Sequence, residues 1–236
     1  MRIRQAFLLA GGKGERLRPL TDTIPKPLVQ VVNKPILQYN IELLSSYGVR
    51  EIILATGYLH EKIEHYFGDG SKFGVKIIHS VEREPLGTGG ALKLCEKNLD
   101  ETFIMGNGDN IADFDFKKML RFHIQKKAQA TLQLVAVDDV TGFGVAKMDG
   151  HKIIEFVEKP SGQAPSNLVN AGAYIIEKDA LGLIPEGFSL IERTMFPALA
   201  AGGKLFGFEH KGYWLTTDTF ERLEAAKKAL LSQKMI

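Results

Sequence analysis

An apolar segment near the start of the chain, Gln5–Ala10, runs directly into Gly11, Gly12 and Gly14. Because glycine has no Cβ, the backbone of such a turn can approach a ligand closely, and several N–H groups can point at one anion. A strand that ends in a glycine-rich loop therefore predicts an α/β sheet with an anion-binding site at the carboxyl end of that strand.

Two cations, Arg16 and Lys26, follow the glycine loop and add fixed positive charge, which favours a polyphosphate as the anion. The Walker A pattern requires a lysine after the last glycine, where Glu15 stands. The dinucleotide fingerprint requires a third glycine, where Leu17 stands. Neither motif is therefore present. The alternative to an anion-binding loop is an ordinary glycine-rich turn whose cations are solvated.

Apolar strands and amphipathic helices alternate through the first half of the chain. Strands are expected at 5–10, 51–57, 75–81 and 102–107, and helices at 36–48, 60–68, 87–99 and 115–128. This order is typical of a doubly wound, mostly parallel, Rossmann-like α/β fold with three layers. The glycine loop, Gly87-Thr88 and Gly108-Asp109 each follow an expected strand, so we expect them to gather at the carboxyl edge of the sheet.

The second half of the chain is richer in strands, which makes the sheet mixed. A strand is expected at 130–137, a hairpin at 144–159 with a tight turn at Asp149-Gly150, and a further strand at 168–177. A helix at 188–203 is expected to have Ser189 as its N-cap. The stretch 205–218 is strand-like, and a last helix at 219–231 is expected to be capped near Thr217 or Asp218. Residues 1–236 are expected to form a single domain.

Composition excludes several classes of protein. The 236 residues contain 30 Lys and Arg against 28 Asp and Glu, and this net charge of +2 predicts no binding to nucleic acid or to a membrane. The single cysteine, Cys95, excludes an internal disulfide, and the six histidines show no zinc-binding spacing. No apolar run reaches the roughly 18 residues of a membrane span, and the N-terminus lacks a signal-peptide cleavage pattern. We expect a cytoplasmic enzyme.

The turn Asn107-Gly108-Asp109 follows the expected strand at 102–107. A carboxylate at the carboxyl end of an apolar strand is a common Mg²⁺ ligand. The alternative is an ordinary turn, for which these residue types are also suitable. The glycine loop in the same chain favours the metal-binding interpretation of Asp109. Asp113 and Asp115 are interpreted as a turn residue and a helix N-cap.

Three positions in the second half could contact a sugar phosphate. Glu158-Lys159 ends a strand, where the lysine could meet a phosphate and the glutamate could accept from hydroxyls; a solvated strand end is the alternative. Asn170 lies in an apolar strand, so its amide must find partners in a sugar or in neighbouring backbone. Gly144 could let backbone lie against a sugar ring, or could simply mark a bulge or a strand start.

A second glycine-rich segment, EPLGTGGAL, opens an expected helix at Gly87. Small residues there would admit a planar base and let backbone groups read its edge. Thr88 as a helix N-cap is the structural alternative.

Taken together, the motifs resemble those of the sugar-1-phosphate nucleotidyltransferases, also called nucleotide-sugar pyrophosphorylases. The resemblance covers nearly the whole chain and rests on LAGGKGERLRPLT, PKPL, EPLGTGGAL, NGD, FGV, VEKP, NAGAY and YWLTTDTFE, in that order and spacing. The opening and EPLGTGGAL look most like mannose- and heptose-1-phosphate guanylyltransferases. NGDNIADFDF, LFGFEHKGYW and Asp218-Thr219 look more like glucose-1-phosphate cytidylyltransferase.

The resemblance implies a role for each matching position. Arg16, Lys26 and Lys159 would be the catalytic cations that hold the triphosphate and the sugar phosphate. Nucleotide contacts would come from the glycine loop and from two later turns: Leu9, Ala10, Gly11, Gly12, Gly14, Gly87, Thr88 and Asn107. Sugar contacts would come from Gly144, Glu158 and Asn170, and Mg²⁺, the implied cofactor, would be held by Asp109 and Asp218. The halves of the domain, about 1–128 and about 129–236, would bind the nucleotide and the sugar.

The chain departs from the family pattern at one metal ligand. Most of the family carries W-x-D-x-G-T, but here Thr216 follows Trp214-Leu215 and the acid comes two residues later, at Asp218. A two-residue displacement in a strand keeps the side chain on the same face and moves it about 6–7 Å. The left-handed β-helix domain of some relatives is not expected.

The function implied is Mg²⁺-dependent transfer of a nucleotidyl group from a nucleoside triphosphate to a sugar 1-phosphate, which gives a nucleotide sugar and pyrophosphate. GTP is preferred over CTP, UTP and dTTP, and the sugar stays open among mannose, a heptose and glucose. A regulatory protein that binds a nucleotide sugar without making it is the alternative, and a dehydrogenase is a distant third. The two substrates are the expected partners, with no nucleic acid or membrane, and a homo-oligomer is left open.

Overall fold

The computed structural model describes residues 2–232, and these form two compact units through which the chain passes more than once. The first unit comprises Met1–Glu84, Asn107–Asp113 and Gly212–Ile236, and the second comprises Pro85–Gly106 and Phe114–Lys211. The single domain with halves meeting near residue 128 stays a prediction.

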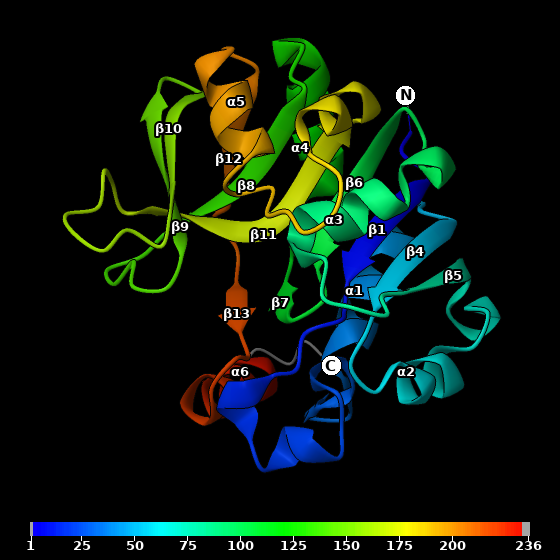
Figure 1. Cartoon of the computed structure of the whole chain (residues 1–236). Helices are drawn as coiled ribbons and strands as arrows, with labels where there is room; N and C mark the ends of the chain where they lie inside the picture. Colours follow the sequence, from blue (N-terminus) through cyan, green and yellow to red (C-terminus); the bar gives the residue numbers. More distant parts are fainter. Residues whose placement is uncertain (1, 233–236) are drawn as a thin grey trace. The chain divides into compact units, whose positions relative to one another are not determined.

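A parallel ladder forms the centre of the first unit (Figure 1). Its strands are β1 (Gln5–Leu9), β4 (Glu51–Thr56) and β5 (Lys76–Val81), in the order β5-β4-β1. Two short antiparallel pairs join β2 (Gln30–Val31) to β3 (Lys34–Pro35) and β7 (Asn110–Ala112) to β13 (Trp214–Thr216). The helices are α1 (Ile36–Ser46), α2 (His60–Phe67) and α6 (Phe220–Ser232), with short 3₁₀ turns η1 (Glu15–Leu17), η2 (Leu20–Asp22), η3 (Lys26–Leu28) and η4 (Ser71–Phe73).

A hydrophobic cluster ties the segment after the glycine loop to the last helix of the first unit. Its buried members come from η1, β2, α1, β7 and α6 and from Val29, which lies between η3 and β2. They are Leu17, Val29, Val31, Ile36, Ile111, Leu223, Ala226 and Leu230. Burying each large aliphatic side chain contributes about 1.5–3 kcal/mol, so this cluster holds residues 15–36 firmly against residues 220–230.

The second unit contains a mixed sheet in the order β6-β11-β8-β12-β10-β9. The strands are β6 (Thr102–Asn107), β8 (Ala130–Ala136), β9 (Gly144–Asp149), β10 (Lys152–Glu158), β11 (Leu168–Glu177) and β12 (Leu205–Glu209). The helices are α3 (Gly87–Leu94), α4 (Phe116–Lys126) and α5 (Met195–Ala201), with 3₁₀ turns η5 (Glu96–Asn98) and η6 (Lys178–Leu183). Within residues 2–232 of this sheet, β12 and β8 pair in parallel, whereas the pairs β6–β11, β11–β8, β11–β9, β12–β10 and β10–β9 are antiparallel.

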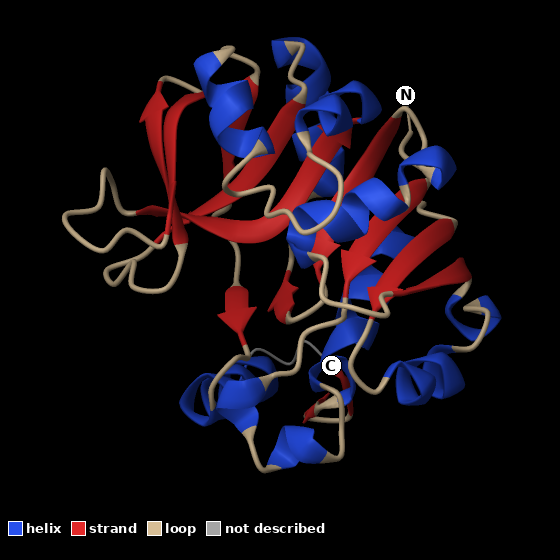
Figure 2. Ribbon diagram, viewed as in Figure 1, coloured by secondary structure: helices blue, strands red, loops and turns tan. Residues whose placement is uncertain are grey.

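Helices cover both faces of this sheet in the second unit (Figure 2). Phe122 of α4 packs edge-on against Phe206 and Phe208 of β12. Phe196 of α5 packs against Tyr174 of β11. Tyr174 is in register with Leu132 of β8, which is in register with Gly207 of β12. Because successive residues of a strand point to opposite faces, Tyr174 lies on the face opposite to Phe206 and Phe208. The three-layer α/β arrangement predicted from the alternating pattern is confirmed in this unit.

Most of the expected elements are present within a few residues of their predicted ends, but three N-cap assignments were wrong. Ser189 does not cap a helix, because its carbonyl accepts from Gly89 N–H and α5 begins only at Met195. Thr88 lies inside α3 rather than before it. The side chain of Thr219, not Thr217 or Asp218, accepts from the backbone N–H of Arg222 at the start of α6.

Two further expectations concern strand ends and caps. The strand-like stretch 205–218 is two strands, β12 and β13, which belong to different sheets. Asp115 caps α4 as predicted, because its carboxylate accepts from Lys118 N–H. Among residues 2–232, no helix combines the length and the apolar character needed to cross a bilayer.

Candidate functional site

The glycine loop of the first unit is folded back on itself. β1 is extended by a hydrogen bond from Ala10 N–H to the Ala55 carbonyl at 2.7 Å. Gly14 has φ 65°, and its carbonyl accepts from the Thr21 hydroxyl at 2.8 Å. A Cβ at Gly14 would lie 3.0 Å from side-chain carbons of Thr21 and Lys26. Glycine is therefore required at this position by backbone conformation and by space.

Lys26 and Asp109 meet in the first unit although 83 residues separate them. The ammonium of Lys26 donates to Oδ2 of Asp109 at 2.7 Å, and the lysine side chain is only 9% exposed. Lys26 opens η3 after Pro25. Asp109 is 42% exposed, so its carboxylate stays accessible from solvent.

The turn that carries Asp109 is attached to the end of β1. Gly108 N–H donates to the Leu9 carbonyl at 2.9 Å, and a Cβ at Gly108 would lie 2.9 Å from that same oxygen. The glycine loop and Gly108-Asp109, two of the three segments expected to gather at the carboxyl edge of the sheet, are thus joined. The position of Gly87-Thr88 beside them stays a prediction. Gly11 and Gly12 lie between β1 and Gly14 in the same loop.

Asp218 is held by two arginines of the first unit. Oδ2 of Asp218 lies 2.7 Å from Nη2 of Arg16, and Nη1 of Arg222 donates to both carboxylate oxygens at 3.0 and 3.2 Å. Burial alone would raise the pKa of Asp218, but the hydrogen bond from Arg222 and the charges of Arg16, Arg222 and Lys26 lower it below the usual 3.8. The carboxyl is therefore an anion at neutral pH, set among cations.

The segment leading to Asp218 lies beside Asp109. β13 pairs with β7 and ends at Thr216, in register with Asn110, and the Thr217 hydroxyl donates to the Asp109 carbonyl at 2.7 Å. The argument that a two-residue displacement keeps the same strand face was wrong, because the strand has ended before Asp218. A turn, and not strand alternation, directs this carboxylate.

Asn107 ends β6 immediately before this turn. Its Oδ1 is buried, and no donor to it is present among the described residues. A buried carbonyl oxygen without a donor is costly, so this atom is suited to accept from a bound ligand.

Three of the positions predicted to contact a sugar phosphate lie together in the second unit. Gly144, at the start of β9, is paired with Glu158, at the end of β10. A Cβ at Gly144 would lie 2.7 Å from the Glu158 carboxylate and 2.6 Å from Phe156, so only glycine leaves room for them. Lys159 follows with φ 48°, a left-handed conformation that is unusual for a side-chain-bearing residue. Its side chain is 63% exposed, and its ammonium lies 3.5 Å from Oε1 of Glu158.

The amide of Asn170 is satisfied within its own strand. Asn170 accepts from Gly172 N–H at 3.1 Å and donates to the Tyr174 hydroxyl at 2.9 Å, across an irregularity in the pairing of β11 with β8. Val169, which precedes Asn170, pairs with Val145 of β9, so Asn170 lies close to Val145. The backbone alternative raised for Asn170 accounts for the Gly172 partner only, since the second partner is a side-chain hydroxyl, and sugar contact stays a prediction.

Gly87 and Thr88 lie against a segment that sequence reasoning overlooked. Gly87 has φ 72°, and a Cβ there would lie 2.4 Å from the Ser189 carbonyl. The Thr88 hydroxyl donates to Glu192 at 2.6 Å and accepts from Ile191 N–H at 3.0 Å. The available signal for Glu192 was an acid within the stretch LIERTMF, which was expected to be helical throughout although α5 begins only at Met195.

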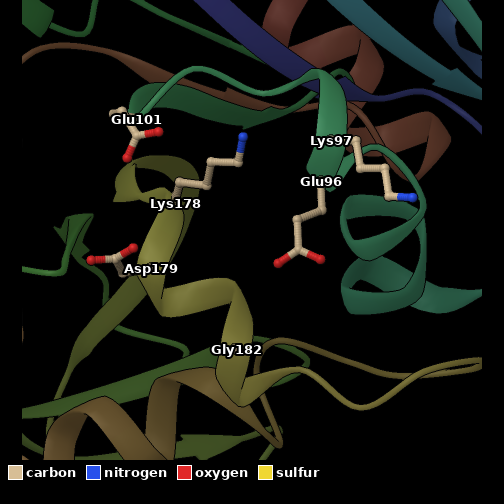
Figure 3. Close-up of a pocket in the computed structure, with 6 residues that line it drawn as sticks. All are labelled: Glu96, Lys97, Glu101, Lys178, Asp179 and Gly182. Carbon is tan, nitrogen blue, oxygen red and sulfur yellow. The ribbon is translucent and has the colours of Figure 1, made fainter.

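Within residues 2–232, the predicted site residues form no three-residue metal cluster, and they do not line the hollow drawn in Figure 3. No group of three His, Cys, Asp or Glu side chains suited to a metal is found within residues 2–232. The metal-ligand candidates of the first unit are therefore the two predicted carboxylates, Asp109 and Asp218. The hollow, of about 570 Å³, is lined by charged side chains from η5 and η6 of the second unit and by Glu101 (Figure 3). None of its lining residues is a predicted site residue.

Comparison with known proteins shows which family the chain resembles. Residues 5–233 match the model of the nucleotidyl transferase family. The chain is 42% identical over 217 residues to a mannose-1-phosphate guanyltransferase of Yarrowia lipolytica. The aligned region covers 89% of this chain and 60% of that protein. It is 38% identical over 221 residues to a mannose-1-phosphate guanylyltransferase of Mycobacterium tuberculosis, which covers 92% of this chain and 61% of that protein.

A solved structure shares the fold over nearly the whole chain. HddC from Yersinia pseudotuberculosis, complexed with GMP-PN, superposes with a TM-score of 0.82 at 30% identity and covers 97% of this chain and 100% of that one. The chain spans about 60% of the length of the curated relatives it matches. The family resemblance predicted from the motifs is confirmed: this chain belongs to the nucleotidyl transferase family.

Proposed function

We propose that this protein transfers a nucleotidyl group from a nucleoside triphosphate to a sugar 1-phosphate. A phosphate oxygen of the sugar 1-phosphate forms a bond to the α-phosphorus, and the bond from that phosphorus to the bridging oxygen of pyrophosphate breaks. The products are a nucleotide sugar and pyrophosphate. Because a sugar phosphate is already ionised near neutral pH, no general base is required.

The observation that carries the proposal is the cluster of Arg16, Lys26, Asp109 and Asp218 around the glycine loop of the first unit. Two anionic substrates repel each other, so the chief task is to position them and to offset their charge. The nearly buried ammonium of Lys26 is fixed by its contact with Asp109 and acts in a setting with little water. Arg16, 68% exposed, is free to turn from Asp218 toward a phosphate.

The donor set fits Mg²⁺, which is part of this proposal. Mg²⁺ is commonly bound through one or two carboxylates together with substrate phosphates, and the Asp109 and Asp218 segments are joined by the Thr217 hydrogen bond. When bound, Mg²⁺ would neutralise charge on the reacting phosphates. Asp109 and Asp218 would hold it, beside the cations Lys26 and Arg16 that contact them.

The sugar 1-phosphate is assigned to Gly144, Glu158, Lys159 and Asn170 of the second unit. Lys159 would bind its phosphate, and Glu158 would accept from hydroxyls. Mannose 1-phosphate is proposed as the first candidate because the two relatives described above are named for it. Leu9, Ala10 and the glycine loop, with Gly87, Thr88 and Asn107, would bind the nucleotide.

GTP is the proposed nucleotide. Support comes from the guanylyltransferase names of those relatives and from the GMP-PN complex of HddC. The proposal also includes a cytoplasmic location and leaves a homo-oligomer open.

Pyrophosphate release tests the proposal directly. Purified protein is incubated with Mg²⁺ and each pairing of GTP, CTP, UTP, dTTP or ATP with mannose, glucose or heptose 1-phosphate. Release with GTP and mannose 1-phosphate is expected to be fastest. Faster release with another pairing would correct the base or the sugar, and no release from any pairing would reject the reaction. Binding of a nucleotide sugar without release would instead support a regulatory protein.

A further inference from the structure

We infer that Glu192 is a positioning residue that fixes the turn at Gly87-Thr88 for nucleotide binding by accepting the only hydroxyl proton of Thr88. This inference rests on the proposed function, which assigns that turn to the nucleotide. Glu192 comes from the stretch between η6 and α5, which passes beside α3 in the second unit (Figure 1).

The contacts between this stretch and α3 are dense and mutual. Gly89 N–H donates to the Ser189 carbonyl at 2.8 Å, and Ser189 N–H donates to the Leu86 carbonyl at 2.9 Å. A Cβ at Gly90 would lie 2.3 Å from the Gly187 carbonyl. The backbones on both sides therefore approach as closely as glycine allows, and a shift of residues 187–192 must shift the start of α3.

The Thr88 hydroxyl completes this attachment. A hydroxyl has one proton to donate, and here it goes to Oε2 of Glu192 at 2.6 Å, while the oxygen accepts from Ile191 N–H at 3.0 Å. The Thr88 side chain thus has no proton left for a ligand in this arrangement. Nucleotide contacts at this turn would come from its backbone, and Glu192 determines where that backbone lies.

Burial of the Glu192 carboxyl group costs free energy, because a buried site disfavours the charged form. Burial raises the pKa of Glu192, and the nearby Glu158 raises it further, whereas the hydrogen bond from Thr88 and the charge of Lys159 lower it. Glu192 is therefore within electrostatic reach of the pair assigned to the sugar phosphate as well as bonded to the turn assigned to the nucleotide.

Substitution separates the hydrogen bond from the charge. Glu192→Gln keeps an oxygen that can accept from Thr88 but removes the charge, and Glu192→Ala removes both. Binding of GTP with Mg²⁺ is measured by titration calorimetry near neutral pH. We expect the Kd to rise about tenfold in Glu192→Ala, as for the loss of one hydrogen bond to a charged group, and to stay within about threefold of wild type in Glu192→Gln. Glu186→Ala, an exposed acid earlier in the same stretch, is the control and should bind GTP as wild type does.

Enzyme kinetics provide a second readout. The KM for GTP is expected to rise in Glu192→Ala while the KM for mannose 1-phosphate changes by less than about threefold, because the contact acts on the nucleotide turn. A general loss of structure would change both constants and lower the thermal midpoint of Glu192→Gln as well.

A double-mutant cycle tests the contact without any ligand. If the two side chains act together, Thr88→Val and Glu192→Ala should destabilise the protein by less in combination than the sum of their separate effects in urea unfolding. Additive effects, unchanged GTP binding in Glu192→Ala, or failure of Glu192→Gln to restore binding would each overturn the inference. If wild type binds none of GTP, CTP, UTP and dTTP, the proposed function fails and takes the inference with it.

Discussion

The ammonium of Lys26 lies 2.7 Å from Oδ2 of Asp109, and the lysine side chain is 9% exposed. A nearly buried cation requires a partner, and Asp109 provides one in the structure without a ligand. The carboxylate, at 42% exposed, faces solvent more than the lysine does. An incoming phosphate or cation can thus take over one side of the pair while the lysine stays where the fold has placed it.

Lys26→Ala should lower kcat by about 100- to 1,000-fold, since losing one fixed charge at the reacting phosphates costs about 3–4 kcal/mol. Lys76→Ala is the matched control, because Lys76 is exposed in the same unit and its ion pair is with Glu51, away from the glycine loop. Pyrophosphate release measures the effect, and circular dichroism establishes that both variants fold. Turnover of Lys26→Ala close to wild type would remove Lys26 from the site.

Gly144→Ala should destabilise the second unit and raise the KM for the sugar 1-phosphate. The new Cβ would meet the Phe156 ring and the Glu158 carboxylate within 2.7 Å, and such overpacking costs about 1–3 kcal/mol. Gly162→Ala is the control, because a Cβ there meets nothing within 4 Å. Urea unfolding and sugar-phosphate titrations of the rate are the measurements. Equal behaviour of the two variants would contradict the prediction.

Asp218→Asn should change how stability depends on acid. The folded-state pKa of Asp218 is lowered, so the ionised form stabilises the protein fully above the ordinary pKa of 3.8 and loses this effect as pH falls through the lowered value. We expect wild type to be more stable than Asp218→Asn near neutral pH and the difference to shrink below pH 3.8. Unfolding free energies from urea titrations at a series of pH values measure it. A difference that is the same at every pH would exclude a titrating contribution from Asp218.

His123 should make the second unit sensitive to mild acid. Its ring is buried between the Thr131 hydroxyl at 2.8 Å and Oε1 of Glu177 at 2.9 Å. Burial lowers the pKa of His123 below 6.5, and Glu177 only partly opposes this shift. Because the unfolded chain takes up the proton first, stability should fall as pH drops from 6.5 toward the lowered value.

His123→Gln, which cannot titrate, tests this dependence. The variant should be less stable than wild type near neutral pH but should lose less stability between pH 6.5 and the acid limb of the curve. Parallel pH profiles for the two proteins would show that another group is responsible.

The elements that sequence predicted well are those whose signal is local. β1 and its glycine loop follow from an apolar run next to glycines, and Asp115 as a cap follows from its place before an amphipathic run. Lys26 and Asp109 belong to segments that follow expected strands, so the sequence could place the glycine loop and Asp109 at one sheet edge, although no local pattern gives the contact between the two side chains.

The features that sequence did not predict depend on partners far along the chain. Ser189 has good cap chemistry, yet its carbonyl is taken by Gly89, so the helix starts later. Asp218 was expected on a strand, but β13 ends at Thr216 and the turn after it is shaped by Thr217 and the Asp109 carbonyl. Glu192 was not assigned a role because its partner, Thr88, lies 104 positions earlier and no local pattern links the two residues.

The route of the chain through the first unit has a consequence for synthesis on the ribosome. Gly108-Asp109 returns to the first unit only after an excursion through residues 85–106, and Asp218 and α6 return after a second one through residues 114–211. The N-terminal segment therefore emerges from the exit tunnel long before its apolar partners Leu223, Ala226 and Leu230 exist. In a nascent chain that is stalled before residue 223, Leu17 and Val31 lack these three partners. We therefore expect chaperones to capture such stalled chains more often than chains in which α6 has been translated.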